Sequence, residues 1–145
     1  MKWIDGTEFG IKGLSGEEIC EKLADELWNY DRSHWLECDE FIQVAAFLID
    51  FDTELQMEGI FGFLVNSIVN YATNVIEAFK AIGDEKDAEI LSEICYLNGN
   101  CEFSEEIESE IEQLENQLYL NREFDIWQLL FEYLDSALIC EDKNE

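Results

Sequence analysis

The chain has 145 residues, 48% of them hydrophobic and 13% aromatic, and its 35 acidic side chains against 8 Lys and Arg give a formal net charge of −27. The aromatic content excludes the disordered acidic class, and the length suffices for one buried core. The charge repels nucleic acid and anionic membranes and speeds encounter with basic partners. We therefore expect a single folded domain, residues 1–145, with an acidic surface.

The five cysteines are odd in number and include no Cys-x-x-Cys pair. Reduced structural thiols are the interpretation that suits this pattern. The N-terminus lacks the apolar run of a signal peptide, and no apolar run approaches the ~18 residues that a membrane span requires. We predict a cytoplasmic protein that does not enter a membrane.

Residues 1–16, rich in glycine with a few apolar side chains, predict an irregular N-terminal arm. Ser15 and Glu18 have the spacing of a capping box, in which the side chain of each residue accepts a hydrogen bond from the backbone of the other. A helix should follow to about Tyr30.

Residues 37–56 form the most apolar segment, hydrophobic nearly all round over 41–51. A helix of this kind belongs in the middle of a bundle, so we predict a central apolar helix here. Gly59 and Gly62 come next. Because glycine costs roughly 1 kcal/mol in a helix interior, we expect them at a bend or at a close backbone contact.

Apolar stripes predict two further helices, the first over residues 72–82 and the second from residue 84 onward. Gly83 lies where the C-terminus of a helix favours a positive φ. Asn98-Gly99 should close the second helix.

Ser104 is predicted to open an acidic helix, Glu105 to about Leu120, and the last helix should run from Asp125 to about Ile139. The chain contains no proline and no hairpin turn between alternating residues. We predict an all-α fold, a single compact domain of about six or seven helices.

Residues with recognisable catalytic chemistry are scarce. His34 is the only histidine, which removes most Ser-His, Cys-His and histidine–metal schemes. Residues 84–87 lack the alternation and central glycine of a calcium loop, and the paired Glu and His of di-iron bundles are missing. We predict no enzyme activity, no metal and no cofactor.

The acidic helix is the strongest candidate for function. Six glutamates lie within residues 104–115, a stretch that spans ~18 Å of helix. A solvated helix face is the plain interpretation, but the net charge favours a basic partner. Duplex DNA carries one charge per ~1.7 Å of axis, so its imitation would need two acidic faces or a homodimer. The predicted partner-binding residues are Glu105, Glu106, Glu108, Glu110, Glu112 and Glu115, with Asp84, Glu85 and Asp87 as a second patch.

Residues 57–67 resemble the DNA-mimic protein family, whose C-terminal domain is widespread in bacteria as a domain of otherwise unknown function. The family block reads Asn-Gly-Gly-Phe-x-Gln-aromatic-apolar-x-Asn. The chain keeps Gly59, Phe63, Leu64 and Asn66 and departs at Met57, Glu58 and Gly62. Later blocks match in the same order at residues 77–83, 88–91, 114–119 and 127–133.

The resemblance covers about residues 40–135 and implies an all-α fold, frequent dimers and, as in the namesake, an acidic surface that imitates DNA to a transcription factor. The leading hypothesis is a non-enzymatic binding protein that occupies the nucleic-acid-binding surface of a basic protein such as a transcription regulator. It would bind no nucleic acid directly. The alternatives are an immunity-type inhibitor of a basic toxin such as a nuclease, a carboxylate-based metal or enzyme bundle, and charge that serves only solubility.

Overall fold

The structure, a computed structural model, describes residues 1–10 and 13–144, except for the side chains of residues 142–144. Within these residues the chain forms seven α-helices, two short 3₁₀ helices and no strand, apart from one isolated bridge between Lys2 and Glu8. The predicted all-α class and helix number are confirmed. The α-helices are α1 Gly16–Glu26, α2 Arg32–Trp35, α3 Glu40–Val65, α4 Ala72–Ala81, α5 Glu85–Asn100, α6 Glu105–Glu115 and α7 Ile126–Asn144, and the 3₁₀ helices are η1 Leu27–Asn29 and η2 Ser67–Tyr71.

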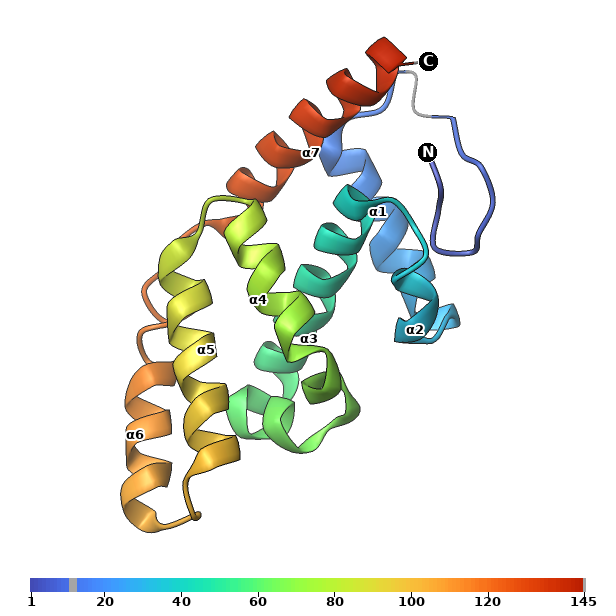
Figure 1. Cartoon of the computed structure of the whole chain (residues 1–145). Helices are drawn as coiled ribbons and strands as arrows, with labels where there is room; N and C mark the ends of the chain where they lie inside the picture. Colours follow the sequence, from blue (N-terminus) through green and yellow to red (C-terminus); the bar gives the residue numbers. More distant parts are fainter. Residues whose placement is uncertain (11–12, 145) are drawn as a thin grey trace.

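Helix α3 runs through the middle of the molecule, with α1 and α7 packed against one part of it and α4 along another (Figure 1). Helix α5 packs against α4, and α6 lies beside α5 at the edge of the molecule. Most α3 side chains over residues 41–55 are buried, which confirms the predicted central apolar helix. Phe51 makes edge-to-face contacts with Phe63 and Phe79, at centroid distances of 5.1 and 5.7 Å.

The N-terminal arm is held against the domain by its apolar residues. Trp3 is buried, and its Nε1 donates to Oε1 of Glu26 at 3.1 Å. Ser15 and Glu18 form the predicted capping box. Helix α1 ends at Glu26, earlier than the predicted Tyr30, because its last turn tightens into the 3₁₀ helix η1. Residues 11–12 of the predicted arm lie outside the described residues.

Helix α3 bends at Gly59. The φ of 72° and ψ of −176° at this residue lie in a region essentially restricted to glycine. At the break, the backbone N–H of Ile60 donates to Oε2 of Glu115 on α6, at 2.8 Å. Gly62 is required one turn later, because a Cβ there would lie 2.2 Å from Cβ of Glu58. Gly59 therefore serves the predicted bend, whereas the close contact at Gly62 is with a side-chain atom and not with backbone, and the helix continues past its predicted end to residue 65.

The ends of the C-terminal helices agree with prediction only in part. Gly83 has the expected positive φ of 88° after α4. Gly99 is helical and α5 continues to Asn100, so the predicted end at 98–99 is wrong. Helix α6 ends at Glu115 instead of Leu120, and the turn that follows it buries Leu118 and Tyr119. Helix α7 extends beyond its predicted end at residue 139.

Candidate protein-binding surface

The glutamates of α6 divide into exposed and half-buried groups. The Ser104 hydroxyl accepts a hydrogen bond from the backbone N–H of Ile107, at 3.2 Å, and so begins the helix as predicted. Ile111 is buried and sets the inward face. Glu108 and Glu115 flank that face and are half-buried. The exposed members are Glu105, Glu106, Glu110 and Glu112.

The exposed glutamates of α6 have no ion-pair partner among the described residues. Two arginines pair with buried carboxylates instead. Arg32 Nε lies 2.6 Å from Oδ2 of Asp50, and Arg122 Nη2 lies 2.9 Å from Oδ2 of Asp87. These arginines neutralise buried carboxylates, and no described ion pair compensates the exposed glutamates of α6.

Glu115 has a structural contact that its place in the acidic run did not reveal. Its Oε2 accepts the Ile60 N–H at the bend of α3, 55 residues away in the sequence. A carboxylate at the first turn of a helical segment also interacts favourably with the helix dipole. Glu115 therefore joins α6 to α3, and the free acidic face is narrower than the sequence predicted.

The predicted second patch is corrected by the structure, because only Glu85 is exposed. Asp87 has no exposed area and accepts hydrogen bonds from the Tyr119 N–H at 2.9 Å and from Arg122 Nη1 and Nη2 at 3.0 and 2.9 Å. Asp84 is 4% exposed and caps α5 by accepting the Asp87 N–H at 3.2 Å. Burial, together with the neighbouring Asp87 carboxyl, raises the pKa of Asp84 to about 7.

This buried network also reaches α3. The Tyr119 hydroxyl donates to Oδ1 of Asp52 at 2.6 Å, and Gln56 Nε2 donates to Oδ2 of Asp52 at 2.7 Å. Burial and the adjacent Asp52 carboxyl raise the pKa of Tyr119. Since Tyr119 and Arg122 both lie in the loop after α6, the network fixes α6 relative to α5 and α3. It is a scaffold for the acidic face.

Two rows of exposed carboxylates were not singled out from the sequence. Glu85, Glu89 and Glu93 repeat every fourth residue along α5, and all three are exposed. Residues 17, 21 and 25 make the same pattern on α1. Residues four apart lie on one face of a helix, so this spacing could have predicted both rows from the sequence. The higher density of glutamates in residues 105–115 drew the prediction to α6 instead.

Groups suited to covalent or metal chemistry are not gathered at this surface. Burial raises the pKa values of the Cys20 and Cys38 thiols to about 12, which leaves them protonated and unreactive at neutral pH. His34 is exposed on the short helix α2. The described residues contain no group of three side chains that could hold a metal ion.

In the part of the chain that the structure describes, no single helix has the length and apolar composition of a membrane span. The pair Glu40–Val65 and Ser67–Ala81, bent by 76°, reaches that composition together.

The fold and this surface define an acidic all-helical domain. Its exposed carboxylates lie on the outer faces of helices that the buried hydrogen-bond network holds together. The sequence model of a family described as DMP19-like protein matches residues 36–137, more than half of the chain. The chain belongs to the DMP19-like protein family. This is a DNA-mimic protein family, which agrees with the resemblance over residues 40–135. Comparison with curated proteins and with solved structures gave no match.

Proposed function

We propose that the protein is a non-enzymatic DNA mimic, which presents the carboxylates of α5 and α6 to the nucleic-acid-binding surface of a basic protein such as a transcription regulator. The observation that carries this proposal is the uncompensated charge of α6. Among the described residues, Arg122 is paired with Asp87 and Lys80 with Glu77, and no ion pair reaches the exposed glutamates of α6. Membership of the DMP19-like family supports the same role.

The spacing of the carboxylates sets how much of a duplex they can imitate. Four residues of helix advance by about 6 Å, so the row 85–89–93 of α5 carries one charge per ~6 Å. A DNA strand carries one phosphate per ~3.4 Å of axis. One row thus supplies roughly half the linear charge of one strand. The row of α5 and the exposed glutamates of α6 are both needed, and a homodimer would double the charged length.

The partner, on this proposal, has pockets that bind phosphates through Lys and Arg. Carboxylates fill such pockets with charge-assisted hydrogen bonds, which are stronger than hydrogen bonds between neutral groups. Since exposed charges are screened within ~8 Å at physiological salt, binding should weaken steeply as salt rises. We place the protein in the cytoplasm, and its five free thiols support a reducing compartment.

Capture from a lysate of the source cells, with and without competing duplex DNA, tests this proposal. The test variant, Glu106→Gln with Glu110→Gln and Glu112→Gln, removes three charges from α6. Its matched control, Glu17→Gln with Glu21→Gln and Asp25→Asn, removes three from the exposed row on α1.

We expect the wild type and the control to capture a DNA-binding protein that duplex DNA releases, and the α6 variant to lose it. Capture that DNA does not affect, or that both variants weaken equally, would refute the proposal. A captured nuclease in place of a regulator would identify an inhibitor of a basic toxin.

A further inference from the structure

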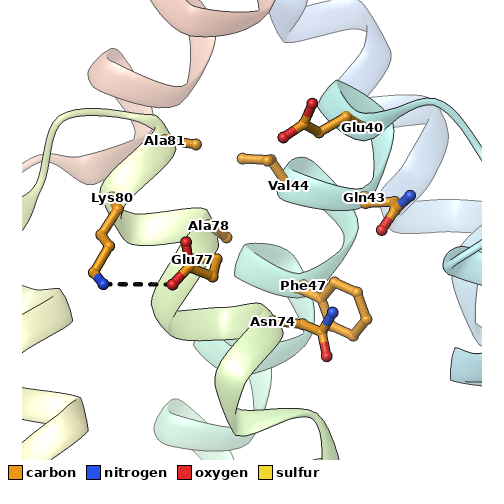
Figure 2. A pocket seen from close by; sticks show the side chains of 9 residues that line it. All are labelled: Glu40, Gln43, Val44, Phe47, Asn74, Glu77, Ala78, Lys80 and Ala81. Carbon is orange, nitrogen blue, oxygen red and sulfur yellow. Dashed lines mark hydrogen bonds and ion pairs between the residues drawn. The ribbon is translucent and has the colours of Figure 1, made fainter.

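A cavity of about 490 Å³ opens between α3 and α4 (Figure 2). Its floor is apolar and largely buried, with Val44 6%, Phe47 1% and Ala78 2% exposed. Phe47 is held in place by ring contacts to Trp35 and Tyr71, at centroid distances of 5.3 and 5.8 Å. The floor is therefore preformed, and the cavity falls in the ~300–1,000 Å³ range typical of ligand sites.

The walls of the cavity supply oxygen acceptors from both helices. Glu40 belongs to α3 and Glu77 to α4, on opposite sides (Figure 2). The amide of Gln43 is oriented by its own hydrogen bonds, since Nε2 donates to the backbone oxygens of Leu36 and Cys38 at 3.2 and 2.9 Å. This leaves Oε1 of Gln43 as an acceptor at the cavity wall.

The charge of the cavity is negative. Lys80 is the cation among its described lining residues, and its Nζ is paired with Oε1 of Glu77 at 3.4 Å, which leaves Glu40 without a counter-charge. Lys80 also lines a second hollow, beside Glu89 and Glu93 of α5. The cavity therefore adjoins the carboxylate row of α5, and a partner that lies along this row would reach it.

We propose that this cavity receives one arginine side chain of the basic partner, an inference that rests on the function proposed above. The methylene stem would lie on Val44 and Ala78. The guanidinium would donate to Glu40, to Oε1 of Gln43 and to the amide oxygen of Asn74. Arginine fits better than lysine because its planar fork has five donors and is weakly hydrated, whereas an ammonium is compact and strongly hydrated.

The test uses a single-arginine probe and the full chain, without the partner. The ¹⁵N-labelled protein is titrated with acetyl-Gly-Arg-Gly-amide at about 150 mM salt, where the Debye length is ~8 Å and diffuse attraction is screened. Matched peptides carry lysine, or citrulline, which has the shape of arginine without its charge. Ala81→Phe fills the mouth of the cavity without changing charge, and Thr73→Phe is the control at an exposed position on the same helix outside the lining.

We expect saturable shifts of the side-chain amides of Gln43 and Asn74 with the arginine peptide, and none with citrulline. Ala81→Phe should abolish the shifts and Thr73→Phe should retain them. Glu40→Gln, at the exposed first residue of α3, should weaken binding about tenfold, because it keeps an acceptor oxygen but removes the charge that strengthens the hydrogen bond.

Shifts that spread over every acidic helix without saturating, that citrulline reproduces, or that persist in Ala81→Phe would overturn the inference. An equal response to lysine would overturn the choice of arginine. Because the probe needs no partner, these outcomes are separate from those of the lysate capture. Loss of the cavity site with intact DNA-sensitive capture would leave the proposed function standing.

Discussion

Replacement of Asp87 by alanine tests the buried network that ties α6 to the rest of the fold. Asp87 has no exposed area and accepts three hydrogen bonds, one from the Tyr119 N–H and two from Arg122. Loss of one partner from a buried ion pair costs about 3–5 kcal/mol. The Arg122 side chain is 23% exposed and can partly return to water, so we expect about 3 kcal/mol. Against a total stability of about 5–15 kcal/mol, this loss is large.

Urea unfolding followed by circular dichroism measures the effect, with Glu85→Ala as the control on the same turn of α5. Glu85 is exposed and its removal should cost less than about 1 kcal/mol. A double-mutant cycle with Arg122→Ala should give a coupling energy of about 2 kcal/mol. A loss below about 1 kcal/mol for Asp87→Ala, or one equal to that of the control, would refute the assignment of this network as a scaffold.

Three further changes probe the backbone and the titration of the buried acids. Gly59→Ala should lower the free energy of unfolding by about 1–3 kcal/mol, since its φ and ψ suit only glycine. Gly99→Ala, at a helical position with open space around it, should raise that free energy by up to about 1 kcal/mol. If both substitutions changed the free energy of unfolding in the same direction, the role of Gly59 in the bend would be contradicted. The raised pKa of Asp84 means that its contribution to stability is present below about pH 4 and is lost as pH rises through about 7. Asp84→Asn, which keeps a capping side chain, should therefore gain stability relative to wild type as pH rises from about 4 to about 7 in urea titrations, and parallel pH profiles would exclude this titration.

The local rules in the sequence predicted the parts of the fold that depend on neighbours along the chain. The capping box of Ser15 and Glu18, the cap at Ser104 and the positive φ of Gly83 each involve contacts within a few residues. The central position of α3 followed from its apolar residues on all sides. These features need no knowledge of tertiary contacts.

The failures have a common physical reason, which is that a distant partner decided the outcome. In the sequence, Asp87 cannot be distinguished from a surface acid. Its pairing partner in the buried network is Arg122, 35 residues later in the chain. Glu115 also has the sequence pattern of a surface acid. Its contact depends on the bend at Gly59, where the Ile60 N–H is free to donate to its carboxylate. The density of glutamates in the sequence therefore predicted a wider exposed acidic face on α6 than the structure has. The regular row of exposed glutamates on α5 was not predicted.

Competition between this protein and duplex DNA for the partner tests the central claim most directly. A fluorescently labelled duplex bound to the purified partner is titrated with this protein, and anisotropy is read at several salt concentrations. We predict full displacement of the duplex, no ternary complex, and a log–log plot of affinity against salt with a steep negative slope. A ternary complex, or an affinity that stays constant from low to high salt, would contradict DNA mimicry.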